Sequence, residues 1–216
     1  MSRPIVAIDG PAGSGKSTLA RRLALALDLP YLNTGTTYRA VAREALRRAI
    51  APTGGQALAS LVGDLRFEID PSSAPPRLIV DGAPPADELR TPEVESIVSE
   101  VARHPALRSA LHEVQRRLGE GGAVVEGRDI GTVVFPQADV KVFLHADPKE
   151  RAARREEELG DPELAAAVAK RDALDARVSP FVPAPDAIVV DSSGRSADET
   201  FEEVLALVRE RLAGGG

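Results

Sequence analysis

Hydrophobic and polar positions follow two different periods near the start of the chain. Residues 3–8, RPIVAI, form a short apolar run rich in β-branched side chains, which is typical of a buried strand. Residues 16–27, KSTLARRLALAL, repeat apolar side chains at the spacing of an amphipathic helix. A glycine-rich segment joins the two, so the pattern predicts a strand, a turn and a helix in direct succession.

Short apolar runs and helical patterns continue to alternate along the rest of the chain. Further strands are predicted at 31–33, 123–127, 140–146 and 187–193, and helical patterns at 34–50, 93–118, 148–176 and 196–213. The last three strands are almost continuously apolar, as are strands buried on both faces of a parallel sheet. The pattern therefore predicts an α/β protein, with a three-layer parallel sheet that carries helices on both faces.

One stretch of the chain has two strand patterns with no helix between them. LRFEID at 65–70 and RLIVDG at 77–82 flank the turn-rich PSSAPP, which predicts two strands joined by a reversal. We interpret residues 62–90 as a small antiparallel insertion in an otherwise parallel fold. The length of 216 residues suits a single domain over 1–216, since domains hold about 100–200 residues.

Composition excludes several classes of function. The chain has no cysteine, which excludes disulfides, thiolate nucleophiles and cysteine-ligated metal sites. Its net charge is −6 and only 3% of its residues are aromatic, which argues against nucleic acid as a partner. No apolar run approaches the about 18 residues of a membrane span, and the first residues lack a basic leader with an apolar core. We therefore expect a cytoplasmic protein without a membrane partner.

The glycine-rich segment GPAGSGKST at 10–18 matches the phosphate-binding pattern Gly-x-x-x-x-Gly-Lys-Ser/Thr. Its glycines allow successive backbone N–H groups to face phosphate oxygens, and the helix that follows adds positive partial charge. Lys16 is expected to reach the β- and γ-phosphates of ATP, and the Ser17 hydroxyl to bind Mg²⁺. The alternative is a glycine-rich turn that only caps a helix. The predicted nucleotide-binding residues are Gly10, Pro11, Ala12, Gly13, Ser14, Gly15, Lys16, Ser17 and Thr18.

A phosphate loop does not say whether the phosphoryl group is transferred, hydrolysed or used as a switch. Guanine-specific switch proteins read their base with Asn-Lys-x-Asp, and the only asparagine here, Asn33, is followed by Thr34. A phosphotransferase acting on a small acceptor is therefore the main hypothesis, and a nucleotide-binding switch is the alternative. Such an enzyme needs arginines that converge on two phosphate-bearing ligands. Arg39, Arg108 and Arg128 follow strand ends or open helices, where α/β sheets bind ligands.

Longer strings in the chain resemble the cytidylate kinase family of nucleoside monophosphate kinases. They are IDGPAGSGKST (8–18), TGTTYR (34–39), LRTPEV (89–94), PALRSAL (105–111), EGRDIGTVVFPQADVKVFL (126–144), RDALDAR (171–177) and PAPDAIVVDSS (183–193). The resemblance implies transfer of the γ-phosphoryl group of ATP to CMP or dCMP. It also implies a core, a monophosphate-binding region at about 34–108 and a lid at about 148–180. We expect a monomer whose partners are these small-molecule substrates.

The resemblance implies a role for each residue that matches a family motif. The residues implied at the acceptor phosphate are Thr34, Arg39 and Arg128. Ser99 and Arg108 would read the O2 and N3 edge of cytosine, and Asp129 would accept from its exocyclic amino group. A carboxylate accepts from an amino group but repels a carbonyl, so Asp129 favours cytosine over uracil. A kinase that also accepts UMP is the enzymatic alternative.

The remaining implied residues lie toward the lid. Asp175 would accept from the sugar hydroxyl, while Arg171 and Arg177 would bind phosphates. Catalytic roles fall to Lys16, Arg128, Arg171 and Arg154, the last of these on a lid helix that also carries Arg151 and Arg155. Asp9 either orients water bound to Mg²⁺ or simply ends its strand as a polar residue.

Overall fold

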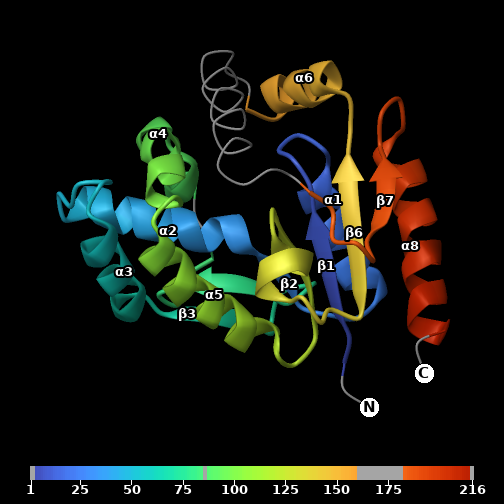
Figure 1. Cartoon of the computed structure of the whole chain (residues 1–216), viewed down its shortest axis with the longest axis horizontal. Helices are drawn as coiled ribbons and strands as arrows, with labels where there is room; N and C mark the ends of the chain where they lie inside the picture. The colour runs from blue at the N-terminus through green and yellow to red at the C-terminus, as the bar shows by residue number, and fades with distance from the viewer. Residues whose placement is uncertain (1–2, 85–86, 160–181, 215–216) are drawn as a thin grey trace.

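The computed structural model describes residues 3–84, 87–159 and 182–214, and it forms one continuous sheet flanked by helices (Figure 1). The strands are β1 (Ile5–Asp9), β2 (Tyr31–Asn33), β3 (Phe67–Asp70), β4 (Arg77–Val80), β5 (Ala123–Gly127), β6 (Val140–His145) and β7 (Ile188–Asp191). The helices are α1 (Lys16–Ala26), α2 (Thr34–Arg47), α3 (Gly55–Asp64), α4 (Pro92–Val101), α5 (Pro105–Gly119), α6 (Pro148–Leu159) and α8 (Ala197–Gly214), with a 3₁₀ turn at Asp87–Arg90 and a π-helix at Ile130–Val134. Among these described elements, none is a helix long and apolar enough to cross a bilayer.

The strand order is β3-β4-β2-β5-β1-β6-β7, and every neighbouring pair is parallel except β3 with β4. The phosphate-loop strand β1 therefore lies between β5 and β6, at the centre of the sheet. Its alternate side chains separate two cores. Val6 and Ile8 pack with α1 and α8, whereas Ala7 packs in the core formed with α2, α3, α4 and α5. Both faces of the sheet are covered by helices, which confirms the predicted three-layer α/β fold.

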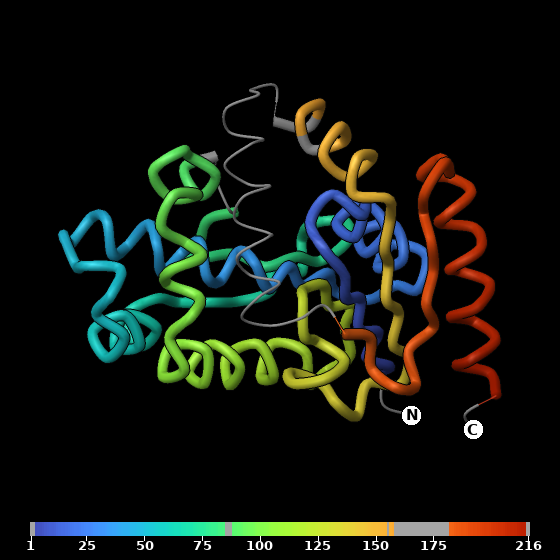
Figure 2. The backbone as a smooth tube through the Cα atoms, turned by 45° about the horizontal axis from the view of Figure 1, so that its top comes forward, coloured from blue at the N-terminus to red at the C-terminus, as the bar shows by residue number. Residues whose placement is uncertain are grey.

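Two helical groups lie on opposite sides of the molecule. Figures 1 and 2 both place α3, α4 and α5 away from α8, while α6 lies beyond the ends of β1 and β6. The carboxyl ends of the central strands thus point toward α6. This is the edge of the sheet at which α/β proteins bind ligands, and it lies between α8 and the helices α3, α4 and α5.

The predicted hairpin is present, and it also extends the main sheet. β3 and β4 pair antiparallel from Phe67 to Val80, as the turn-rich sequence between them indicated. β4 then pairs with β2 through Tyr31 and Arg77, and the Tyr31 N–H donates to the Pro76 carbonyl at 2.7 Å. The hairpin therefore continues the sheet instead of standing apart from it.

The helical pattern at 93–118 is two helices in the structure. α4 ends at Val101, and α5 begins at Pro105 after an extended residue, His104. Proline lacks the N–H of a continuing helix and disfavours helical backbone in the residue before it. Hydrophobic spacing continues through the break because both helices bury one face in the same core, which is why the pattern alone did not separate them.

The packing of α1 against the sheet gives a first prediction. Leu23 of α1 is fully buried in the core that α1 and α8 form with the sheet. Leu25, also on α1, is 52% exposed. Replacing Leu23 with alanine should lower the free energy of unfolding by about 2–5 kcal/mol, because a cavity remains where the side chain packed. Leu25→Ala is the matched control and should change it by about 0.5 kcal/mol or less. Urea denaturation measures both, and equal losses would contradict this assignment of the α1 core face.

Candidate functional site

Three strands that are neighbours in the sheet end at the same edge. β5 lies between β1 and β2, with Gly127 opposite Asp9 and Glu126 opposite Asn33. The residues that follow these ends are the phosphate loop after β1, Arg128 after β5 and Thr34 after β2. The topology therefore brings three sequence-predicted segments to one place.

The loop between β1 and α1 has a backbone that only glycine adopts easily. Gly10, Gly13 and Gly15 have φ angles of 149°, 73° and 90°, and a Cβ on Gly10 would lie 2.0 Å from the Leu144 carbonyl oxygen. Gly15 opens α1 without any side-chain cap, so the first N–H groups of this helix have no capping partner from that residue. Free backbone donors at a helix N-terminus form an anion site.

Lys16 and Ser17 lie at the start of α1 and make defined contacts. The Lys16 ammonium donates to the Pro11 carbonyl of the same loop at 2.6 Å. The Ser17 hydroxyl donates to Oε2 of Glu126 at 2.9 Å. Glu126 is 3% exposed, so this contact lies in the interior at the end of β5.

Glu126 is a site residue that the sequence analysis missed. Its Oε1 accepts from the Tyr31 hydroxyl and from Asn33 Nδ2, the latter at 2.7 Å, while Oε2 accepts from Ser17. Burial and the neighbouring Glu126 charge raise the pKa of Tyr31 well above its ordinary value, which keeps this hydroxyl protonated and donating. Polar side chains from α1 and β2 thus converge on one carboxylate of β5. The available signal was a carboxylate inside an apolar strand next to β1.

Asp9 ends β1, and its carboxylate binds the backbone of the segment that follows β5. Its Oδ1 accepts from the Ile130 N–H and its Oδ2 from the Gly131 N–H, each at 2.7 Å. Of the two roles considered for Asp9, these contacts favour the polar strand end over the Mg²⁺-water ligand.

The start of α2 meets the end of β5. The Thr34 hydroxyl donates to the Glu126 carbonyl at 2.7 Å. Arg39 Nε donates to Glu95 Oε1 at 2.6 Å, in an ion pair whose side chains are 13% and 7% exposed. The Arg39 guanidinium also lies over Gly35, since a Cβ there would be 2.9 Å from its Nη1. A positive group therefore lies over the N-terminal turn of α2.

Arg108 and Asp129, predicted to read the base, pair with each other. The Arg108 Nη2 donates to the Asp129 carboxylate. Ser99 on α4 has a buried hydroxyl with no hydrogen-bond partner in the described part of the chain. Arg128 comes directly before Asp129 and is partly exposed. The structure therefore brings Arg108 and Asp129 together, and their roles toward a base, like that of Ser99, stay predictions.

Two further titratable side chains pack beside the Arg108–Asp129 pair. The Tyr38 hydroxyl lies 3.4 Å from His112 Nε2. Burial raises the pKa of Tyr38 to about 12, and Asp129 adds to this while Arg108 opposes it. Burial also lowers the pKa of His112. Both groups are therefore neutral at pH 7, so the charges beside them are those of Arg108, Asp129 and Arg116.

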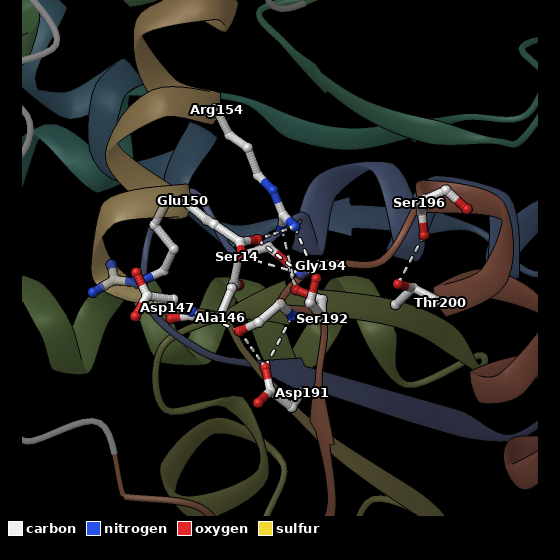
Figure 3. A network of polar contacts seen from close by, with 12 residues as sticks. Ser14, Ala146, Asp147, Glu150, Arg154, Asp191, Ser192, Gly194, Ser196 and Thr200 are labelled. Atoms are coloured by element: carbon white, nitrogen blue, oxygen red, sulfur yellow. Dashed lines mark hydrogen bonds and ion pairs between the residues drawn. The ribbon is translucent and has the colours of Figure 1, made fainter.

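Helix α6, which the sequence analysis expects to be part of a lid, contacts the phosphate loop and the segment after β7 (Figure 3). Arg154 donates to the Ser192 carbonyl at 2.8 Å and to Glu150, and the Ser192 hydroxyl donates to the Ser14 carbonyl at 3.2 Å. Arg151 donates to the Ala12 carbonyl at 3.0 Å. The base of α6 is thus joined to the loop directly by Arg151 and through Ser192 by Arg154.

Three predicted residues lie outside the described residues: Arg171, Asp175 and Arg177. The side chain of Arg155 is also outside them. Within the described ranges no group of three or more histidine, aspartate or glutamate side chains could hold a metal ion.

The comparisons with known proteins cover almost the whole length of the chain. The cytidylate kinase family model matches residues 6–210. Cytidylate kinase from Desulfitobacterium hafniense (strain Y51) is 42% identical over 97% of this chain and 94% of its own length. A bifunctional pantoate ligase/cytidylate kinase from Synechococcus sp. (strain JA-2-3B'a(2-13)) is 43% identical over 99% of this chain, which spans only 42% of that relative.

Among solved structures, an uncharacterized protein from Eubacterium ventriosum ATCC 27560 aligns with a TM-score of 0.52 at 13% identity, over 96% of this chain and 99% of its own. At this identity the likeness concerns the fold alone. The match to the family model and the near-complete alignment with curated relatives decide the assignment, and the chain belongs to the cytidylate kinase family.

Proposed function

We propose that the chain transfers the γ-phosphoryl group of ATP to CMP or dCMP, giving ADP and CDP or dCDP. The observation that carries this proposal is the double contact of Glu126. Its carboxylate binds Ser17 of the phosphate loop, and its backbone carbonyl binds Thr34 at the start of α2. A donor-phosphate loop and a second, arginine-bearing helix N-terminus therefore share one residue, which is the arrangement that transfer between two phosphates needs.

ATP is the donor in this proposal and binds along the loop from Gly10 to Thr18. The left-handed backbone of Gly13 and Gly15 and the uncapped start of α1 orient N–H groups toward phosphate oxygens. Lys16 exchanges its contact with the Pro11 carbonyl for the β- and γ-phosphates, which costs one hydrogen bond and gains stronger charge-assisted ones.

The residues beside the loop fit Mg²⁺. The Ser17 hydroxyl donates its hydrogen bond to Glu126, so its lone pairs are left for a cation. Glu126 places a carboxylate one hydroxyl away, where it can accept from metal-bound water. Mg²⁺ keeps several waters and binds phosphates with few protein ligands, which agrees with the absence of a larger ligand group in the described ranges. Mg²⁺ would supply neutralisation of charge on the transferred group.

Thr34, Arg39 and Arg128 hold the acceptor phosphate in this proposal. Arg39 is oriented by Glu95 toward the α2 N-terminus, and Arg128 follows the neighbouring strand end. The base lies toward Arg108, Asp129 and Ser99, whose buried hydroxyl has a donor and acceptor to offer a ligand.

The reaction needs positioning more than it needs a base. An oxygen of the acceptor phosphate attacks the γ-phosphorus in line, a new P–O bond forms as the bond to ADP breaks, and ADP leaves with that electron pair. Lys16 and the arginines neutralise the like charges that oppose the approach of two phosphates. We assign Arg154 and Arg171 to the same task from the lid at about 148–180, with Arg177 on phosphate and Asp175 on the sugar.

Specificity for the acceptor is the first test of the proposed function. ADP release, coupled to a reporter reaction, should be fast with CMP and dCMP and at least about tenfold slower with UMP at equal concentration, because Asp129 meets a carbonyl in uracil. Efficient use of UMP would support the broader pyrimidine kinase. Little ADP formation with any acceptor would support a nucleotide-binding switch and reject the proposal.

The division between donor and acceptor sites gives a second test. Arg128→Ala should raise KM for CMP by about tenfold or more and leave KM for ATP nearly unchanged, because a charge-assisted contact to the acceptor is lost. Lys16→Ala should lower kcat by about 10²–10³-fold with every acceptor. Steady-state kinetics with each substrate varied in turn measures both. Equal loss of ATP affinity in the two variants would contradict the division.

Glu126 provides a third test, which concerns Mg²⁺. Glu126→Gln should raise the Mg²⁺ concentration for half-maximal activity by about 10–100-fold, because a carboxylate that orients metal-bound water is lost. Calorimetry of ATP binding with and without Mg²⁺ gives a readout independent of turnover. Glu44→Gln is the matched control, since Glu44 is also buried and paired, but its partners are Arg47 of α2 and Arg48, the residue that follows this helix. An unchanged Mg²⁺ requirement in Glu126→Gln would remove Glu126 from the metal site.

A further inference from the structure

The segment that carries Arg128 and Asp129 continues directly into an unusual turn. Residues Ile130–Val134 form a π-helix, in which Val133 and Val134 donate to the Asp129 carbonyl and Phe135 donates to the Ile130 carbonyl. Single π-helical turns are rare and concentrate at functional sites. Asp129 occupies the position of the N-cap, yet its side chain makes no capping hydrogen bond and pairs instead with Arg108.

Asp9 takes over the capping role that Asp129 does not fill. Its two carboxylate oxygens accept the N–H groups of Ile130 and Gly131, each at 2.7 Å, and the residue is 6% exposed. These N–H groups belong to the first turn of the π-helix, where donors lack partners inside the helix. A residue 121 positions earlier in the chain therefore satisfies the donors and leaves the Asp129 side chain for the base site.

The far end of the same turn is held by a positive charge. Arg116 on α5 donates from Nε to the Val134 carbonyl and from Nη2 to the Val133 carbonyl, both at 2.9 Å. An anion at the first turn and a cation at the last turn both complement the helix dipole. Gly131 has little room to move, since a Cβ there would lie 3.1 Å from Lys141 Cδ and 3.3 Å from Asp9 Oδ2.

Asp9 also belongs to the donor side of the site. It is the last residue of β1 and is bonded to Gly10, the first residue of the phosphate loop. The charges of both Asp129 and Lys16 act on its carboxyl group. One buried carboxylate thus connects the strand that positions the donor loop with the turn that positions Arg128 and Asp129.

We propose that Asp9 is a positioning residue, which fixes the place of the Arg128–Asp129 segment relative to the phosphate loop. Arg116 on α5 fixes the other end of the turn that follows this segment. The inference rests on the proposed function for the roles of Arg128 and Asp129. Transfer in line depends on the separation of donor and acceptor, and a displacement of about 1 Å costs up to about 10²-fold in rate. Loss of the Asp9 contacts should therefore impair acceptor use and base selection before it impairs ATP binding.

Asp9→Asn tests this proposal with little change in volume. The amide keeps one acceptor and turns a donor toward the other N–H, so the turn loses one of its two ties. We expect KM for CMP to rise by about tenfold, kcat to fall, and the preference for CMP over UMP to narrow, with KM for ATP within about twofold of the unmodified protein. Calorimetric titration with CMP and with ATP should show the same split.

Asp139→Asn is the matched control. Asp139 also accepts a backbone N–H of β1, that of Ile5 at 2.7 Å, but at the opposite end of the strand from the site. It should leave both KM values and the CMP preference unchanged. If Asp9→Asn folds and retains its KM for CMP and its preference, or loses ATP affinity to the same degree, the proposal is overturned.

Arg116→Met extends the test to a side chain on the exposed surface, so that the result does not depend on a buried substitution. Arg116→Met should raise KM for CMP by a smaller factor than Asp9→Asn does. Arg117→Met, which changes the neighbouring exposed residue, should leave KM for CMP unchanged. An unchanged KM for CMP in Arg116→Met would reject the positioning role of Arg116. Failure of the unmodified protein to phosphorylate CMP would reject the proposed function itself. An active protein whose kinetics do not change in Asp9→Asn would reject only the positioning role of Asp9.

Discussion

The parallel pairing of β1 with β5 is the interaction on which the site depends. It sets Asp9 opposite Gly127, so the phosphate loop and the Arg128 segment leave the sheet side by side. β2 pairs on the other side of β5 and adds the start of α2 to the same edge. Each strand is buried in apolar cores on both faces, and a shift in register would move those side chains out of place. Core packing therefore fixes the separation of the charged groups.

Two buried carboxylates turn this backbone arrangement into a polar site. Glu126 accepts hydrogen bonds from Ser17, Tyr31 and Asn33, and Asp9 accepts them from two backbone N–H groups. Burial raises the pKa of Asp9, and its two backbone hydrogen bonds oppose that rise by favouring the charged form. A buried polar group is costly unless it is satisfied. Each carboxylate has its partners, so each can stay in the interior and order the residues around it.

Hydrophobic periodicity predicted most of the fold, because the strands and helices bury continuous apolar faces that local sequence displays. The phosphate loop was equally visible, since its glycines and Lys16 are contiguous. The break before Pro105 was hidden because α4 and α5 share one core. Glu126 and the partners of Asp9 were hidden for a different reason. Their side-chain contacts join residues 93 to 122 positions apart, and such pairs depend on the sheet order, which no local pattern contains.

The side chain of Asp129 shows how long-range contacts change the role that local sequence gives a residue. At the start of a helix, an aspartate normally accepts from the helix's own N–H groups. Here Asp9 accepts from them, and Asp129 pairs with Arg108 instead. The carboxylate that we propose to read the base is thus a residue that local chemistry would have used as a cap. Under the proposed function, selectivity for the acceptor would therefore depend on β1, the strand that carries the phosphate loop.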